Sequence, residues 1–398
     1  MTQLYLYDDA VARSFEPFAL TRPFGEMRAG IALGRTRWER ALDARAAGFI
    51  GAEHLRDFDE AGAPPAAGDV RADSILANSR CLVPLGWSAH DADVWTCEGA
   101  IAAVRLAHGA SVAELEGGAR ALESLRAAGT RVVDIPGTWV EHVWELVTRL
   151  GVQLREDIDA LGPHLACTRP DGALVIGGGG VYVEDGAQVE SQVVFDVTSG
   201  PVLVRRGAQV RAFTRLVGPC AVLENASVLG DRVSGCSIGE GSVVRGEISE
   251  TVVLGHSNKG HDGFVGHSYL GRWVNLGAGT ITSNLKNTYG SVQLWTPAGT
   301  RDTGASKLGS MIGDHAKTGI GTRLTTGTVI GAGANVFGSE MPPKYVPPFS
   351  WMEGARMTEF RLPKFLEIAT RAMSRRSVTL SERGRRQLSA SHARSRSA

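Results

Sequence analysis

The densest group of side chains capable of chemistry lies between residues 256 and 284, where histidines, asparagines and lysines alternate with glycines. Three histidines, His256, His261 and His267, fall within twelve residues. Imidazole accepts a proton near neutral pH, so it can take the proton that an amine loses when it attacks a thioester. Neighbouring amides can orient a substrate or donate to an oxyanion, and an ammonium group suits a phosphate. The segment predicts an acyl-transfer site with His261 as its base, and we interpret His256 and His267 as structural corner residues.

A spacing of six residues predicts the elements that position this segment. From about Leu174 onward, aliphatic residues recur at every sixth position and are followed by small or turn-forming residues. The clearest run of sixes is Ile312, Thr318, Leu324, Ile330 and Val336. Three such units make one triangular coil, in which the aliphatic residue points inward and Gly, Asn or Asp takes the corner. Because one coil cannot bury its own core, several must stack, and residues 174–340 predict a left-handed parallel β-helix.

Other segments depart from this spacing. Residues 284–307 lack it, so we expect them to leave the prism as a loop, and such loops often carry function. Pro342-Pro343 and Pro347-Pro348 are expected to end the regular coils. Residues 341–398 form a predicted C-terminal extension, helical at first and then, from about Arg371, a disordered basic tail.

The first part of the chain, residues 1–165, shows no repeat and predicts an ordinary α/β domain. Leu4–Tyr7 is expected to form a strand that leads into Asp8 and Asp9. The apolar spacing of Trp139–Val147 predicts a helix.

Composition narrows the possible functions. The 398 residues carry 42 basic and 42 acidic side chains, which gives no reason to expect a nucleic acid or an anionic membrane as partner. Five cysteines without a CxxC pair favour a reducing compartment over a disulfide framework or a Cys-rich zinc site. We see no signal segment and no run of about 20 apolar residues, and therefore expect a cytoplasmic protein.

Two parts of the sequence resemble a known family. One runs from Ser257 (SNKGHDGFVGHS) through the NLGAGT motif at Asn275 to SNLKNTYG at Ser283, and the other comprises Leu6–Asp9, Thr21–Pro23 and Glu26–Ile31. They are similar to the variant bacterial family of bifunctional UDP-N-acetylglucosamine diphosphorylases and glucosamine-1-phosphate N-acetyltransferases. The resemblance implies an α/β nucleotidyltransferase-like domain followed by a trimeric β-helix. It also implies acetyl-CoA and a sugar phosphate, most simply glucosamine 1-phosphate, as substrates.

The resemblance further implies roles for individual residues. His261 and Asn284 would be catalytic and Asn275 would bind the acceptor. The backbone of three residues would lie beside acetyl-CoA: Gly277, Ala278 and Gly279. Phe264 stands where better-known enzymes have a tyrosine, and Ser249 to Thr251 where they have a lysine.

These departures leave the acceptor's phosphate without its usual partners. The remaining candidates to bind the substrate are Lys259, Lys286, Tyr289 and Arg272. Either these residues take over phosphate binding, or the acceptor sugar differs.

The same family would bind a nucleotide, UTP or another NTP, in its N-terminal domain. The Gly-rich loop that usually cradles the triphosphate is missing here. Arg22 and Arg28 stand near the corresponding place and could meet phosphates, while Asp8 and Asp9 could hold Mg²⁺. The alternative is a degenerate domain kept for assembly or regulation, with these residues in structural ion pairs.

Two further functions stay open at this point. His256 and His261 are five residues apart, the spacing at which β-helix carbonic anhydrases bind zinc with a third histidine across a trimer interface. A regulatory or scaffold β-helix protein would keep the fold without turnover or acetyl-CoA binding. A homotrimer is expected for the acyltransferase, because this family builds its active site at the boundary between subunits.

Overall fold

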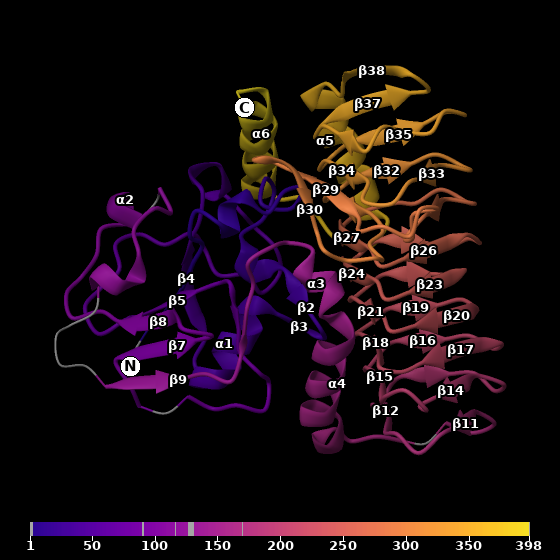
Figure 1. Ribbon diagram of the computed structural model, residues 1–398, viewed down its shortest axis with the longest axis horizontal. Coiled ribbons are helices and arrows are strands. Elements are labelled where there is room, and N and C mark those ends of the chain that lie inside the picture. Colours follow the sequence, from indigo (N-terminus) through magenta and orange to yellow (C-terminus); the bar gives the residue numbers. More distant parts are fainter. Residues whose placement is uncertain (1–2, 90, 116, 126–130, 169, 398) are drawn as a thin grey trace. The chain divides into compact units, whose positions relative to one another are not determined.

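The computed structural model describes residues 3–89, 91–115, 117–125, 131–168 and 170–397 (Figure 1). The chain divides into two compact units. The first comprises Met1–Val143 together with Leu380–Ala398, and the second comprises Trp144–Thr379. The last helix therefore belongs to the N-terminal unit, although it lies at the far end of the sequence.

A six-stranded mixed sheet with the order β4-β1-β5-β8-β7-β9 forms the centre of the first unit. Its strands are β1 (Leu4–Tyr7), β4 (Ala46–Ile50), β5 (Ile75–Asn78), β7 (Val94–Cys97), β8 (Ala100–Arg105) and β9 (Val132–Asp134). Strand β1 pairs in parallel with β4 and β5, which confirms the strand predicted at the start of the chain. Helix α1 (Gly34–Leu42) packs on this sheet through Trp38, which is fully buried.

The smaller elements of this unit connect these strands. They are η1 (Ala12–Ser14), η2 (Phe24–Glu26), β2 (Arg28–Ala29), β3 (Ala32–Leu33), η3 (Glu53–Leu55), β6 (Cys81–Leu82), α2 (Val112–Leu115), η4 (Leu122–Leu125) and β10 (Thr138–Trp139). The helix predicted over Trp139–Val147 begins only at Glu145, where α3 (Glu145–Thr148) starts, so the prediction is wrong for residues 139–144. Trp139 instead pairs with β6, and the Arg80 guanidinium lies 4.5 Å from the centre of its ring.

The C-terminal helix α6 (Glu382–Arg396) also packs on this domain, so the prediction of a disordered tail from Arg371 is wrong. On its inner face Leu388 is buried. Gln387 and Ser391 donate hydrogen bonds of 3.2 Å and 2.7 Å to main-chain carbonyls of the N-terminal domain. The tail is rich in Arg and Ser, but its buried residues all lie on one face of the helix, and that face packs on the domain.

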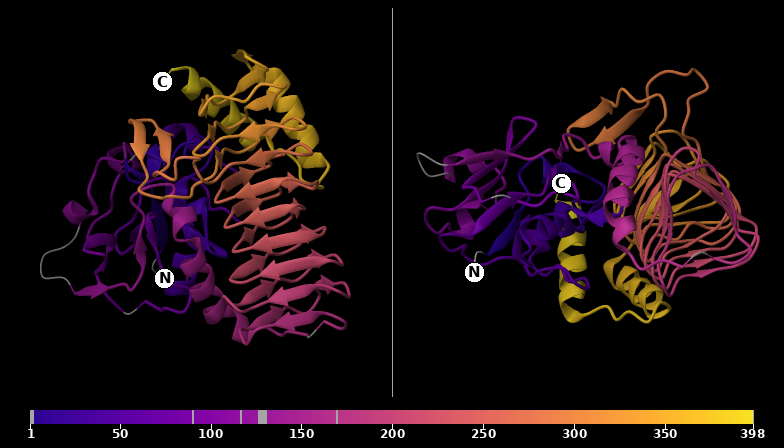
Figure 2. Two further views of the ribbon diagram at one scale, coloured as in Figure 1. Left: turned by 45° about the vertical axis from the view of Figure 1, so that its right-hand side comes forward. Right: turned by 90° about the horizontal axis from the view of Figure 1, so that it is seen from below.

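The second unit is a left-handed β-helix whose coils stack as a three-sided prism (Figures 1 and 2). Its first face contains β11 (Leu174–Ile176), β14 (Val194–Asp196), β17 (Thr214–Val217), β20 (Asp231–Ser234), β23 (Glu247–Ser249), β26 (Phe264–Gly266), β28 (Ile281–Thr282) and β33 (Arg323–Leu324). Its second face contains β12 (Val181–Val183), β15 (Val202–Val204), β18 (Cys220–Val222), β21 (Ser237–Ile238), β24 (Val252–Gly255), β27 (Tyr269–Arg272), β31 (Met311–Ile312), β34 (Val329–Ile330) and β36 (Tyr345–Val346). Its third face contains β13 (Gln188–Val189), β16 (Gln209–Val210), β19 (Ser227–Val228), β22 (Val243–Val244), β25 (Asn258–Lys259), β32 (Lys317–Thr318), β35 (Asn335–Phe337), β37 (Ser350–Glu353) and the antiparallel β38 (Arg356–Glu359).

The predicted sixfold spacing produces the prism's interior. One residue per coil enters each interior column, because neighbouring coils pair in parallel and in register. In the first face the column is Phe195, Leu216, Val233, Ile248 and Val265, each at most 1% exposed. Removing this apolar surface from water is the main favourable contribution to the stability of the prism.

The coils continue past the proline pairs, contrary to prediction. Strand β36 pairs with β34 and β37 pairs with β35, so regular stacking ends at Glu353. Pro342-Pro343 and Pro347-Pro348 lie between these strands, where a ladder hydrogen bond is not required of their nitrogens. Helix α5 (Leu362–Ser374) follows, and its Phe365 packs edge-to-face on Phe349 with ring centroids 5.0 Å apart.

The remaining elements of this unit lie outside the prism wall. The segment predicted to leave the prism forms an antiparallel hairpin of β29 (Gln293–Thr296) and β30 (Gly299–Asp302) (Figure 2). Trp295 of the hairpin stacks on Tyr345, with ring centroids 3.6 Å apart. Before the first coil come α3 (Glu145–Thr148), α4 (Leu150–Leu161) and η5 (Gly162–His164). Among the described residues, no helix is long and apolar enough to cross a membrane.

Candidate active site

His261 is exposed in the corner that follows β25 and precedes β26. The carbonyl of Asp262 accepts a hydrogen bond of 3.0 Å from the Gly279 nitrogen, so this corner stacks directly on the corner of the next coil. The His261 ring has no hydrogen-bond partner within the described part of the chain. An exposed imidazole beside a corner of small residues can accept a proton from a ligand that approaches from solvent.

The predicted acetyl-CoA segment, Gly277, Ala278 and Gly279, forms that next corner. A Cβ atom on Gly277 would lie 2.5 Å from the Gly319 carbonyl carbon and oxygen, and Gly279 has a φ of +70°. Gly277 is therefore required for the close stacking of the coils, whereas Gly279 is favoured by its left-handed backbone conformation. A role toward acetyl-CoA stays a prediction.

Asn275 lies on the third face, between Asn258 on one coil and Lys317 on the next. The Asn258 Nδ2 donates to the Asn275 Oδ1 at 3.0 Å, which fixes the orientation of the Asn275 amide. The Asn275 Nδ2 has no partner among the residues that the structure describes, so it can donate to a ligand. The polar pair forms a prepared surface on the face that ends at the His261 corner.

The sequence reasoning missed Lys317, which continues this polar column. Desolvation lowers its pKa to about 8, and its Nζ donates to the His315 carbonyl at 3.2 Å. No carboxylate lies within salt-bridge distance of this ammonium among the described residues. A signal was available, because Lys317 directly precedes Thr318 of the sixfold run and must therefore point outward.

Asn284, in the corner after β28, contacts His267, in the corner after β26 on the coil before. The Asn284 Nδ2 lies 2.9 Å from the His267 Nδ1, and the His267 Nε2 lies 3.1 Å from a Glu250 carboxylate oxygen. An amide donor on Nδ1 requires the proton of a neutral ring to lie on Nε2, facing the carboxylate. The hydrogen bond with His267 lowers the pKa of Glu250. The chain of contacts from Glu250 through His267 holds the Asn284 amide in one orientation. The interpretation of His267 as a simple corner residue did not predict this role.

The structure does not bring His261 and Asn284 together within one chain. His261 lies in the corner before β26, whereas Asn284 contacts His267 in the corner after it. The strand β26 separates them by the width of one prism face. The two predicted catalytic residues therefore belong to different edges of the same face.

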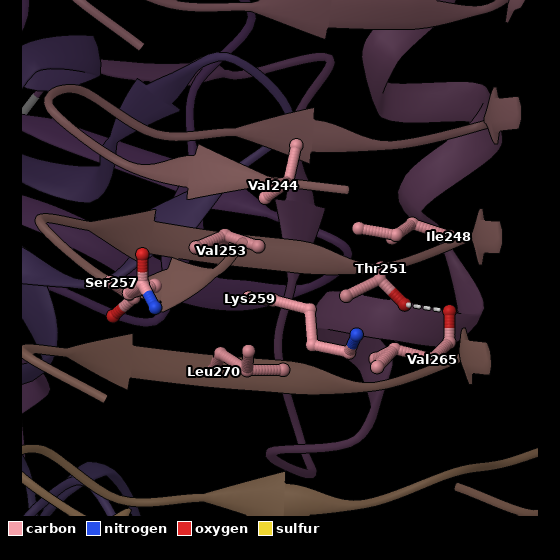
Figure 3. A pocket seen from close by; sticks show the side chains of 9 residues that line it. Val244, Ile248, Thr251, Val253, Ser257, Lys259, Val265 and Leu270 are labelled. Atoms are coloured by element: carbon pink, nitrogen blue, oxygen red, sulfur yellow. Dashed lines mark hydrogen bonds between the residues drawn. The ribbon is translucent and has the colours of Figure 1, made fainter. Parts of the chain in front are cut away.

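The predicted substrate-binding lysine Lys259 points into the prism, which corrects its predicted role toward a phosphate (Figure 3). Its side chain is 1% exposed, and its Nζ donates to the main-chain carbonyls of His261 and Asp262, the latter at 2.9 Å. Burial lowers its pKa. In this conformation the ammonium cannot reach a ligand outside the prism.

The other three substrate-binding predictions fare differently. Arg272 is buried and forms an ion pair with Glu240. Lys286 donates to the Ser291 carbonyl within its own loop. Tyr289 is 76% exposed and free of the prism wall. None of these groups lies in the polar column of Asn275, and their binding of substrate stays a prediction.

His256 has a structural role in a column of stacked rings. Its imidazole lies parallel to Trp273 with centroids 4.5 Å apart, and Trp273 in turn stacks on His315 at 6.3 Å. Within the described residues, no group of three or more His, Cys, Asp or Glu side chains could hold a metal ion. A ring held against Trp273 is poorly placed to coordinate zinc with His261, so the zinc alternative is not favoured.

The predicted magnesium ligands differ in their surroundings. Asp9 is paired with Arg80, at 2.9 Å, and also accepts hydrogen bonds from Asn78 and from the Ala12 nitrogen. Asp8 is buried, accepts a hydrogen bond of 2.8 Å from the Phe24 nitrogen, and has its pKa raised to about 6 by desolvation. Oxygens already engaged in this way do not fit a Mg²⁺ site.

The two predicted phosphate-binding arginines are internal. Arg22 is 1% exposed and pairs with both carboxylate oxygens of Glu60, at 2.7 Å and 3.1 Å. Arg28 is 5% exposed and donates to the Ile31 carbonyl at 2.7 Å. This packing agrees with the alternative in which these residues form structural ion pairs and hydrogen bonds, and nucleotide binding by them stays a prediction.

Comparison with known proteins adds a line of evidence from homology. Residues 4–163 match the family described as sugar nucleotidyl transferase. A bifunctional sugar-1-phosphate nucleotidylyltransferase/acetyltransferase of Sulfurisphaera tokodaii is 29% identical over 169 residues, 39% of each chain. The bifunctional protein GlmU of Cupriavidus pinatubonensis is 30% identical over 49% of this chain and 40% of its own, and that of Synechococcus elongatus is 28% identical over 42% and 28%. The chain thus spans well under half the length of these relatives.

Proposed function

We propose that the β-helix transfers an acetyl group from acetyl-CoA to the amine of an amino-sugar phosphate. Residues 4–163 of the same chain match the sugar nucleotidyl transferase family. Glucosamine 1-phosphate is the acceptor that we propose first. The single observation that carries the proposal is the exposed imidazole of His261. Its corner stacks on the Gly277–Gly279 corner and ends the face that carries the Asn258–Asn275 amide pair. The names of the similar nucleotidylyltransferase/acetyltransferases support it.

In the proposed reaction the amine of the acceptor attacks the carbonyl carbon of the thioester. A C–N bond forms, the C–S bond breaks, and CoA leaves as the thiol. The His261 imidazole takes the proton that the amine loses. The Asn275 Nδ2 donates to the acceptor, and the Lys317 ammonium in the same polar column meets its phosphate.

The arrangement of the site also supports a homotrimer. His261 and Asn284 lie at opposite edges of one face, so a second copy is needed to bring an Asn284 amide to each His261 ring. Most soluble oligomers of identical chains have closed symmetry, and the trimer is the closed form that the family resemblance implies. The expected mass in solution is about three times the chain mass of 42.2 kDa.

The proposal is tested by incubating the full chain with acetyl-CoA and glucosamine 1-phosphate and measuring the released CoA thiol. His261→Ala should reduce kcat by about 10² to 10⁴, the range typical for loss of a general base. The matched control is His164→Ala, which removes another exposed histidine of the same unit and should leave kcat unchanged. No thiol release from the unaltered chain with this acceptor, or with other amino-sugar phosphates, would contradict acetyl transfer.

The shared site has its own test. Chains carrying His261→Ala and chains carrying Asn284→Ala should each be inactive alone. Mixed trimers assembled from the two should regain part of the activity, because some sites would then contain both side chains. If mixing restores nothing although mass measurement shows that mixed trimers have formed, the two residues do not act across a subunit boundary.

The N-terminal domain provides a second candidate function, nucleotidyl transfer to a sugar 1-phosphate. The observation in its favour is the family match over residues 4–163, and the internal packing of Arg22 and Asp9 weighs against it. The test is pyrophosphate release from UTP or dTTP with N-acetylglucosamine 1-phosphate and Mg²⁺. Release above a protein-free blank would support nucleotidyl transfer. No release from a preparation active in acetyl transfer would favour a structural role for this domain.

A further inference from the structure

Lys259 occupies a position that the four preceding coils fill with valine, namely Val189, Val210, Val228 and Val244. It pairs in register with Val244 on the coil before, and its neighbours inside the prism are Ile248, Val253, Val265 and Leu270 (Figure 3). An aliphatic residue would satisfy the same packing without bringing a charge into a hydrocarbon interior. The presence of an ammonium here therefore requires a separate explanation.

The polar partners of this ammonium are main-chain groups of a single corner. The Lys259 Nζ donates to the carbonyl of His261 and, at 2.9 Å, to that of Asp262. No carboxylate lies within salt-bridge distance of the Nζ in the described parts of the chain. The cost of burying the charge is thus offset mainly by holding these two carbonyls.

The corner that carries His261 needs such a restraint. Gly260 precedes it and Gly263, with a φ of +130°, follows it, so the two residues between them are flanked by the most flexible residue type. The side chains of His261 and Asp262 are both exposed, and an ion pair of 3.2 Å with Arg245 on the coil before is the only salt bridge that either makes among the described residues. Apart from the Gly279 nitrogen on the Asp262 carbonyl, Lys259 makes the contacts that hold this main chain from inside.

We propose that Lys259 is a positioning residue for His261. Its ammonium fixes the main chain of the corner from within the prism, and thereby fixes the place from which the imidazole takes the proton of the acceptor amine. Lys259 touches neither substrate. The inference deepens the proposed acetyl transfer and rests on it. A restraint on His261 affects catalysis only if His261 acts in that reaction.

The test is the full chain carrying Lys259→Met, which keeps an unbranched apolar side chain of similar length and removes the ammonium. Thermal stability should stay the same or rise, because a desolvated charge is lost and packing is retained. The kcat for CoA release should fall by about tenfold or more, since a small misplacement of a reacting group is costly. The KM values for both substrates should change by less than about threefold, because His261 would act on the chemical step.

The matched control is Val228→Ala, which opens a cavity in the same interior column two coils earlier. This variant should lose thermal stability and keep its kcat. Opposite effects of the two variants on stability and on kcat would separate positioning from general weakening of the prism. Lys259→Met with an unchanged kcat would overturn the proposal, and Lys259→Leu serves in its place if the methionine variant fails to fold.

Amide hydrogen exchange distinguishes failure of this inference from failure of the proposed function. Residues 260–263 should exchange faster in Lys259→Met than in the unaltered chain, while the strands β24 and β27 keep their protection. Faster exchange without any acetyl transfer by the unaltered chain would leave the restraint standing and reject the function. Unchanged exchange at this corner would overturn the positioning role whatever the chain catalyses.

Discussion

Replacing the buried Asp8 with asparagine is expected to stabilise the N-terminal domain at neutral and alkaline pH. Asparagine keeps an oxygen that can accept the hydrogen bond of the Phe24 nitrogen, now 2.8 Å from the carboxylate. It removes a charge that is almost fully shielded from solvent. The effect should therefore depend on whether Asp8 is ionised in the unaltered chain.

The magnitude follows from the pKa of Asp8, which desolvation raises from 3.8 to about 6. The folded state favours a protonated Asp8, so the contribution of Asp8 to stability is most favourable below about pH 3.8. This contribution falls as pH rises toward about 6, and above that pH the whole cost of burying the ionised carboxylate is present. At about 1.4 kcal/mol per pH unit, the penalty is roughly 3 kcal/mol. The gain from Asp8→Asn should thus be about 2 kcal/mol larger at pH 8 than at pH 4.5.

Urea unfolding followed by amide hydrogen exchange in β1 and β5 would report on this domain. Asp91→Asn is the matched control, because the Asp91 side chain is 87% exposed and should show no such difference between the two pH values. An equal effect of Asp8→Asn at both pH values, or a loss of stability at pH 8, would refute the reasoning. Mg²⁺ should stabilise neither form, and stabilisation of the unaltered chain alone would restore Asp8 as a metal ligand.

Two further predictions concern the β-helix. Phe195→Ala should lower the free energy of unfolding of the prism by about 3 to 5 kcal/mol, because Phe195 is fully buried in the interior column. A loss below about 1 kcal/mol in urea unfolding would contradict this prediction. The control Phe213→Ala, at a side chain 77% exposed, should cost about 0.5 kcal/mol or less. In acetyl-transfer kinetics, KM for the sugar phosphate should rise as pH passes about 8, where Lys317 loses its proton. Lys317→Met should raise KM at pH 7 and abolish this pH dependence. A steep rise of KM with pH that persists in the variant would assign the pH dependence to another group.

The sequence by itself determined the β-helix and singled out the segment of His261 as the candidate site. Coils of a solenoid contact only their neighbours, so the repeat that builds one coil also sets the register of the next. Local spacing was therefore enough to place Ile312 and Ile330 inside the prism, where both are fully buried. The strand at the start of the chain followed from equally local apolar patterning.

The tertiary structure decided what depends on residues far apart in the chain. Helix α6 is ordered because its inner face meets carbonyls 366 and 371 positions earlier, and no composition of the tail reveals that surface. Asp9 is engaged by Arg80, 71 positions away, which changes a predicted metal ligand into one half of an ion pair.

The candidate site shows the same division. Asn284 could be found from the sequence. Its contact with His267, and the contact of the Glu250 carboxylate with the same imidazole, depend on the stacking of successive coils. Lys259 lies in a polar motif that favoured an outward, ligand-binding role, whereas register places it at an inward position. A repeat determines which positions face inward, but whether a buried ammonium finds carbonyls there depends on the path of the main chain around the corner.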